Sequence, residues 1–122
     1  MHHLPHQIPG VARQAMTALA PAFERSHVLE SGEWVARCAA DMAQLWQHGD
    51  LWAITEVQST KDGRALHVVA CAGQWDAGEL LAEIEAWGRR VGCNEVFLTG
   101  RRGWARKLPD YRIETITMRK GL

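Results

Sequence analysis

Apolar residues recur at intervals of three and four between residues 75 and 93, which places them on one face of a helix. Two acidic residues stand early in this segment and two arginines late, the order that the helix dipole favours. Short β-rich runs flank it, at 66–71 and 95–99. The pattern therefore predicts a βαβ unit at the centre of the second half of the chain. The apolar positions of the helix are Leu80, Leu81, Ile84, Trp87 and Val91.

The same criteria predict two helices and a β-hairpin ahead of this unit. Residues 11–27 have a helical apolar face, and Pro21 indicates either a kink or two shorter helices. A second helix is expected from Ser31, a good N-cap, to about Gln47. Strands at 51–57 and 66–71, joined by an Asp-Gly turn at 61–64, form the hairpin.

The remaining segments complete the expected organisation. We expect residues 1–10 to be an extended lead-in, a short basic helix to begin near Gly103, and a last strand to occupy 111–120. The 122 residues then form one α+β domain, 1–122, with a mixed sheet. Its core should bury five residues between the central helix and the sheet. They are Val69, Leu81, Ile84, Val96 and Leu98.

Composition excludes several classes of function. The net charge is +0, so no global field attracts nucleic acid or a membrane. No apolar run approaches the roughly 20 residues of a membrane span, and the first residues lack the apolar core of a signal peptide. The three cysteines, Cys38, Cys71 and Cys93, have no CxxC or His/Cys ligand spacing. We therefore expect free thiols, no metal site and a cytoplasmic protein.

The second half resembles a known family. The run Leu80-Leu81-x-x-Ile84-Glu85-x-Trp87-Gly88-x-x-x-Gly92-Cys93-x-x-Val96-x-Leu98 is similar to the CoA-side helix and following strand of the GNAT superfamily, the acyl-CoA-dependent N-acetyltransferases. Residues 104–111 and 118–122 resemble its short helix, turn and closing strand. The resemblance covers about residues 50–122. It implies a GNAT-like fold with acetyl-CoA as the cofactor.

The resemblance also implies where the cofactor would bind. The family holds the CoA pyrophosphate at the start of the central helix, where Gly73, Gln74 and Gly78 stand in this chain. Their spacing departs from the family's, and Trp75 and Asp76 add bulk and negative charge. We therefore expect a degenerate CoA loop and little or no acetyl transfer.

Candidate chemical groups are few. Glu56 or His67 could deprotonate an amine. The position where the family often has an acidic Tyr falls near Ala105, and Tyr111 is the nearest phenol. Arg101 and Arg102 open a basic cluster that could clamp CoA phosphates, nucleic acid or an acidic partner, or could simply be a solvated helix end.

The run of glycines, arginines and Trp at 100–104 also resembles small GNAT-like proteins of tailed bacteriophages and prophages. That resemblance implies an assembly or interaction role, with a virion or host protein as partner, in the host cytoplasm or the virion. The alternative is an acyl-CoA-dependent N-acetyltransferase that acts on an unknown amine. A nucleic-acid binder is disfavoured by the zero net charge and the lack of a recognition motif.

Overall fold

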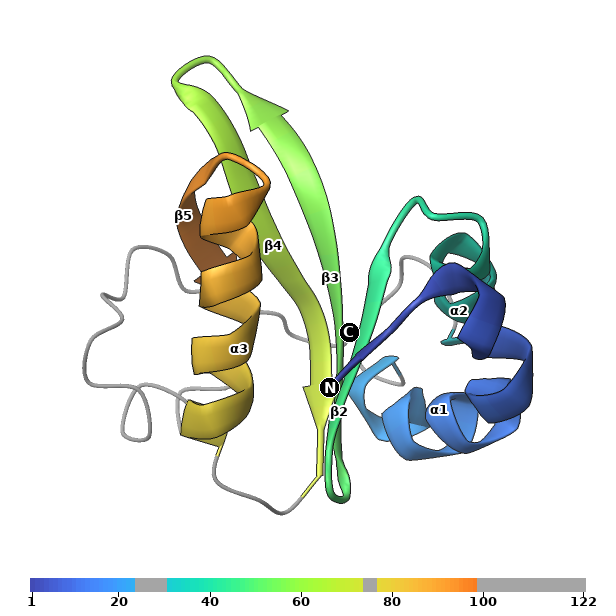
Figure 1. Ribbon diagram of the computed structural model, residues 1–122. Helices are drawn as coiled ribbons and strands as arrows, with labels where there is room; N and C mark the ends of the chain where they lie inside the picture. The colour runs from blue at the N-terminus through green and yellow to red at the C-terminus, as the bar shows by residue number, and fades with distance from the viewer. Residues whose placement is uncertain (24–30, 74–76, 99–122) are drawn as a thin grey trace, which may run out of the picture.

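The computed structural model describes residues 1–23, 31–73 and 77–98, which form one mixed sheet and its flanking helices (Figure 1). The N-terminal half supplies β1 (His2–His3), a 3-10 helix η1 (Pro5–Gln7), α1 (Ile8–Phe23), α2 (Ser31–Ala39) and β2 (Gln44–His48). The rest supplies β3 (Leu51–Thr60), β4 (Gly63–Ala72), α3 (Ala77–Arg90) and β5 (Cys93–Leu98).

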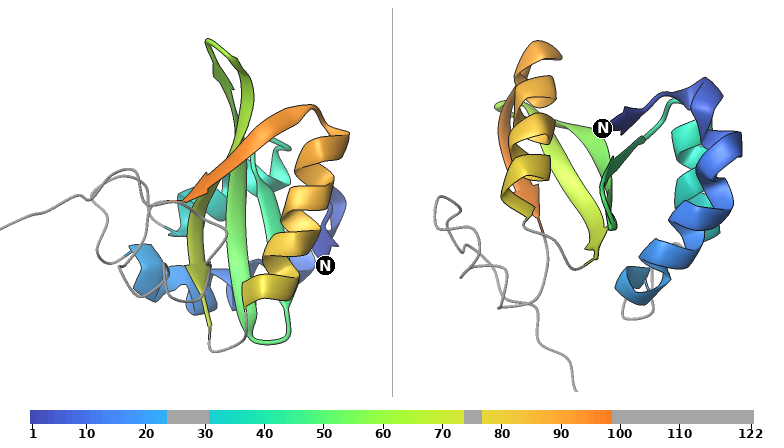
Figure 2. Two further views of the ribbon diagram at one scale, coloured as in Figure 1. Left: turned by 90° about the vertical axis from the view of Figure 1, so that its left-hand side faces the viewer. Right: turned by 60° about the horizontal axis from the view of Figure 1, so that its bottom comes forward.

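The strands follow one another across the sheet in the order β1-β2-β3-β4-β5. Each neighbouring pair is antiparallel except β4 and β5, which are parallel and joined through α3. Figure 2 shows α3 on one face of the sheet and α1 with α2 on the other. This confirms the predicted α+β class, the hairpin and the βαβ unit.

The helix α3 covers one core. Its residues Leu80, Leu81 and Ile84 are buried against Leu66 and Val68 of β4. This confirms the helix face that the periodicity predicts. Trp87, Val91, Val96 and Leu98 pack at the margin of the same core and are only partly buried, so the predicted full burial of Val96 and Leu98 is wrong.

The helices α1 and α2 cover a second core on the opposite face. Leu19 of α1, Trp34 of α2 and Ile54 of β3 are buried in it. Pro21 lies inside α1, which continues through it as one helix to Phe23. Up to Phe23, the alternative of two shorter helices is therefore wrong. Within the described residues, no helix has the length and apolar character that crossing a bilayer requires.

A bulge in β4 places Val69 in this second core, so the prediction that it packs beneath α3 is wrong. Ile54 of β3 pairs with Ala70 and Thr55 pairs with Val68, which leaves Val69 as an extra residue. The alternation of side chains therefore changes phase at this point. Val68 faces α3, whereas Val69 and Ala70 both pack on the side of α1 and α2.

The first ten residues are not an extended lead-in. His2 and His3 pair with Trp46 and Leu45 of β2, and α1 already begins at Ile8. The His3 side chain is buried, and its Nε2 lies 2.9 Å from Oε1 of Gln47.

The strand β2 also corrects the sequence prediction, because the second helix ends at Ala39 rather than near Gln47. Asp41 has a left-handed φ of 61°, which a helix does not accommodate. Leu45 and Trp46, expected on one helical face, are both buried but on opposite faces of the sheet. Met42, expected beside them, is 62% exposed. The short apolar run fits either period, and pairing with β3 decides it.

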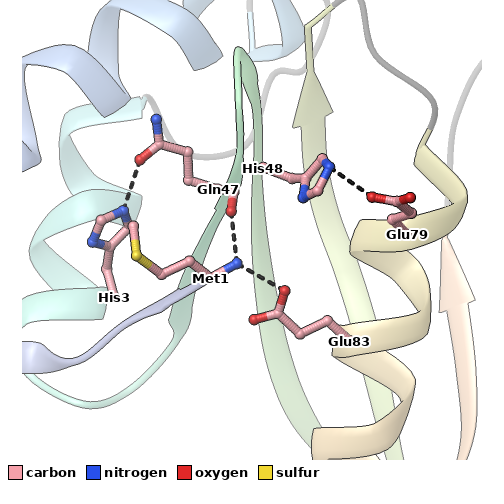
Figure 3. Close-up of polar contacts among 6 residues, drawn as sticks. All are labelled: Met1, His3, Gln47, His48, Glu79 and Glu83. Atoms are coloured by element: carbon pink, nitrogen blue, oxygen red, sulfur yellow. Dashed lines mark hydrogen bonds and ion pairs between the residues drawn. The ribbon is translucent and has the colours of Figure 1, made fainter.

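Polar contacts hold β2 against its surroundings (Figure 3). His48 Nε2 lies 2.9 Å from the Glu79 carboxylate, and the Met1 amino group lies 2.8 Å from that of Glu83. Glu79 and Glu83 are one turn apart on α3, so the first contact joins this helix to β2 and the second joins it to the residue that precedes β1. The Met1 amino group also donates to the Gln47 carbonyl, at 2.7 Å.

Several predicted features lie outside the described residues. They are the end of the first helix at 24–27, Thr99 at the end of the fifth strand, the basic helix from Gly103 and the last strand at 111–120. The cysteines lie within the described residues and are all free thiols. Burial raises the pKa of both Cys38 and Cys71 to about 12, so these thiols stay protonated at neutral pH.

Candidate functional site

Strand β4 has two strand partners along its first half and one along its second. The parallel pairing with β5 runs from Arg64 opposite Cys93 to Val68 opposite Leu98, the last residue of β5 that the structure describes. β4 itself continues to Ala72, toward the start of α3 (Figure 1). Among the described residues, 69–72 therefore have a strand partner only in β3. We call this stretch the open β4 edge; at about 3.3 Å per residue it is roughly 13 Å long.

Gly73 fixes the lower end of the open β4 edge. Its φ is +140°, and a Cβ built there would lie 2.6 Å from the carbonyl oxygen of Asp50 and 2.6 Å from the Cα of Leu51. Only glycine allows the backbone to approach the β2–β3 turn this closely. The chain leaving β4 is thereby held against that turn just before α3.

The loop predicted to bind the CoA pyrophosphate is only partly visible. Gly73 directly follows β4 and Gly78 lies in the first turn of α3, so the open β4 edge leads toward the positive end of a helix dipole. Gln74 lies outside the described residues, as do Arg101, Arg102 and Tyr111.

The two base candidates of the sequence are neighbours across β3 and β4. Glu56 pairs directly with His67. Gln58 joins them, because its Nε2 lies 3.1 Å from Glu56 Oε1 and 3.3 Å from His67 Nδ1. Arg37 of α2 reaches the other carboxylate oxygen of Glu56, at 3.4 Å. We call these residues, together with Phe97, the polar row.

Phe97 ends the polar row on β5. It is the strand partner of His67, and the two rings stack with centroids 4.5 Å apart and planes 7° from parallel. The Phe97 ring is 37% exposed. The next strand pair, Val68 with Leu98, is the last before the open β4 edge. The polar row therefore crosses the sheet next to the last pair that β4 forms with β5 among the described residues.

His67 is the unusual member of the polar row. Its Nε2 is buried, and no residue that the structure describes forms a hydrogen bond with it. Burial lowers the pKa of this imidazole, and the Glu56 carboxylate opposes that shift to a smaller extent. The neutral form therefore dominates at pH 7. An unsatisfied buried polar atom calls for an explanation, and binding of a ligand is one.

Sequence reasoning missed three of the five residues of the polar row: Arg37, Gln58 and Phe97. Gln58 follows Glu56 by two residues, so strand alternation puts both on one face, and that spacing was the available signal. For Arg37 and Phe97 the sequence contains no such signal, because each is brought to the row by tertiary packing. No sequence pattern indicated the bulge at Val69 either.

The comparisons with known proteins agree on the fold. No family model matches the chain, and no curated protein matches it in sequence. Among solved structures, an aminoglycoside acetyltransferase from an uncultured soil metagenomic sample, crystallised with sisomicin, superimposes with a TM-score of 0.69 at 11% identity. The superposition covers 100% of this chain and 94% of that one.

Two further structures support the same assignment. A probable acetyltransferase gives a TM-score of 0.67 at 10% identity over 100% of this chain and 95% of that one. A GNAT family acetyltransferase from Staphylococcus aureus gives 0.59 at 11% identity, over 100% and 98%. The chain therefore has the GNAT acetyltransferase fold, as the sequence resemblance predicts. Likeness at such low identity defines the fold and leaves the activity to be argued from the site.

Proposed function

We propose that this chain binds a CoA thioester along the open β4 edge and transfers the acyl group slowly, if at all. The stretch at residues 69–72, which among the described residues has a strand partner on one side only, is the observation that carries the proposal. An extended ligand with amide groups can pair with a free strand edge as an added strand would. The pantetheine arm of CoA carries such amides, and the acetyltransferases of this fold use acetyl-CoA.

The direction of the ligand follows from the two ends of the edge. The phosphates belong near the N-terminus of α3, where the dipole is positive. The thioester then lies toward Val68 and Leu98, beside the polar row. In acyl transfer an amine nitrogen would form a bond with the carbonyl carbon as the C–S bond breaks. Glu56 would take the amine proton, and the thiolate would leave and be protonated.

Slow transfer is proposed because the sequence departs from the family at two places, the phosphate-binding loop and the position of the proton donor. Asp76 precedes α3 with Glu79 three residues on, and a carboxylate there competes with phosphate for the dipole. Ala105 stands where the family often has an acidic Tyr. A positioned proton donor contributes about 10²–10⁴-fold. We therefore expect a kcat well below the ordinary range of about 1–10³ s⁻¹.

Thermal unfolding with acetyl-CoA tests the proposal. A ligand at about 100 times its Kd stabilises a protein by about 2.7 kcal/mol. We expect stabilisation by millimolar acetyl-CoA, none by equal ATP, and a larger effect in the Asp76→Gly variant. No stabilisation at millimolar acetyl-CoA in either protein would refute thioester binding. Acetylation of small amines at an ordinary kcat would refute slow transfer.

A second candidate function is an assembly or interaction role in a tailed bacteriophage or prophage. The Gly-Arg-Arg-Gly-Trp run at 100–104 and the degenerate loop at 74–78 favour it. The protein would then act on a virion or host protein, in the bacterial cytoplasm or in the particle. Mass spectrometry of purified virions and the position of the gene among virion genes test this role. A gene among metabolic genes, with no protein in particles, would contradict it.

A further inference from the structure

The hydrogen bonds of Gln58 determine which nitrogen of His67 carries the proton. The Glu56 carboxylate only accepts hydrogen bonds, so the Gln58 atom 3.1 Å from it must be the amide nitrogen. That same nitrogen lies 3.3 Å from His67 Nδ1 and has a second hydrogen to give. Nδ1 therefore accepts. In a neutral imidazole, the proton is then on Nε2.

We propose that the Nε2–H group of His67 is a donor site for the carbonyl oxygen of the thioester, a role that rests on the proposed binding of CoA thioesters. Nε2 is buried, and no described residue accepts from it. His67 lies two residues before the bulge at Val69, where the open β4 edge begins. A thioester carbonyl is a hydrogen-bond acceptor that would pair with this donor. The donor would also polarise the carbonyl.

This arrangement divides the work of the two base candidates. Nε2 cannot accept a proton while it carries one, so His67 is the donor and Glu56 is left as the proton acceptor. Gln58 contacts Glu56 and His67 and is given no role toward the thioester or the amine; it acts as a positioning residue, because it sets the tautomer of His67. Phe97 covers one face of the imidazole ring and restricts its rotation. Gln58 and Phe97 together thus hold the Nε2–H group of His67 in a fixed direction.

A second histidine–glutamine pair supplies the internal control. Gln47 donates through Nε2 to the Gly49 carbonyl, at 3.0 Å, so its Oε1 is the atom that faces His3 Nε2 at 2.9 Å. Replacing Gln47 with Glu keeps an acceptor oxygen at this place. Replacing Gln58 with Glu removes the donor and gives His67 an acceptor beside Nδ1. The two substitutions are the same chemical change, but we expect only the one at Gln58 to change the tautomer of its histidine.

The tautomer is read from ¹⁵N NMR shifts of the histidine-labelled protein at pH 8. We expect the wild type to show His67 protonated at Nε2, and Gln58→Glu to move the proton to Nδ1. Gln47→Glu should leave both His3 and His67 protonated at Nε2. If Gln58→Glu does not fold, Gln58→Leu should yield a mixture of tautomers. Protonation of wild-type His67 at Nδ1, or no response to either Gln58 substitution, would overturn the inference.

The carbonyl itself is tested by comparing acetyl-CoA with CoA, which lacks it. Acetyl-CoA should shift the Nε2–H resonance of His67, and CoA should not. His67→Phe keeps an aromatic ring at this position. It should weaken the binding of acetyl-CoA by about 2- to 12-fold, the contribution of one net hydrogen bond, and leave the binding of CoA unchanged. Binding of both ligands with His67 unperturbed would overturn the inference alone. Binding of neither ligand would overturn the proposed function and the carbonyl site together, while the tautomer is measured independently.

Discussion

The two halves of β4 differ in what surrounds them. Residues 63–68 lie between β3 and β5, and Leu66 and Val68 are buried beneath α3. Residues 69–72 are paired with β3, and no other strand of the described residues pairs with them. The first half therefore gains the burial and hydrogen bonds that stabilise the fold. The second half is the proposed ligand-binding edge, and the bulge at Val69 marks the boundary between the two.

The largest expected effect is in the core beside the closed half. Ile84 is fully buried between α3 and the sheet. Ile84→Ala should lower the free energy of unfolding by roughly 2–5 kcal/mol, through lost burial and the cavity that remains. Urea denaturation measures it, with exposed Arg90→Ala as the control expected within about 0.5 kcal/mol. A loss below about half a kcal/mol for Ile84→Ala would show that α3 packs differently.

Gly73→Ala should cause the next largest loss of stability, and it should act at the end of the open β4 edge. The new Cβ would meet the backbone of Asp50 and Leu51 at a positive φ, a strain of about 1–3 kcal/mol. Calorimetric unfolding measures this loss. Gly10→Ala is the matched control, because nothing lies within 4 Å of a Cβ there. In helix α1 it should gain about 0.5–1 kcal/mol. Equal effects of the two substitutions would argue against the close approach at Gly73.

These two regions also separate what the sequence could predict from what it could not. Helix α3, the β3–β4 hairpin and β5 follow from periodicity and an Asp-Gly turn, because local rules decide them. Gly63, in that turn, has the positive φ expected of it, +131°. Strand β2 was assigned to a helix, since a short apolar run satisfies both periods until β3 pairs with it.

The site was predictable only in part, for a related reason. Glu56 and His67 were identified as acid–base candidates by residue type, but their pairing depends on the register of β3 with β4. The link through Gln58 and the open β4 edge depend on the bulge and on where β5 ends. Register, bulges and strand ends arise from tertiary pairing. A pattern along one chain does not contain them.

The bulge predicts a smaller contrast between adjacent residues on either side of the boundary. Val68 is 4% exposed beneath α3, whereas Val69 is only partly buried on the opposite face. At about 0.8 kcal/mol per buried methylene-sized group, Val68→Ala should cost about 1.6 kcal/mol. Val69→Ala should cost clearly less. Chemical denaturation of the two variants compares them directly, and the reverse order would place the bulge elsewhere.

The smallest effect concerns pH and the polar row. Burial lowers the pKa of His67 in the folded protein below its ordinary value of about 6.5. The unfolded chain then binds a proton at a higher pH than the folded one. Stability therefore falls as the pH drops through about 6.5 toward the lowered pKa, and it is unaffected by His67 above that window. The Glu56 carboxylate and the Arg37 guanidinium are the charged groups of this row.

His67→Phe removes the titrating group and keeps the stack with Phe97. The variant should lose less stability than the wild type between pH 7 and pH 5. His2, whose pKa burial also lowers, remains in both proteins and supplies the shared background. Chemical denaturation at a series of pH values gives the two profiles. Parallel profiles would mean that His67 binds its proton equally in the folded and unfolded states, and its burial would then have no electrostatic consequence.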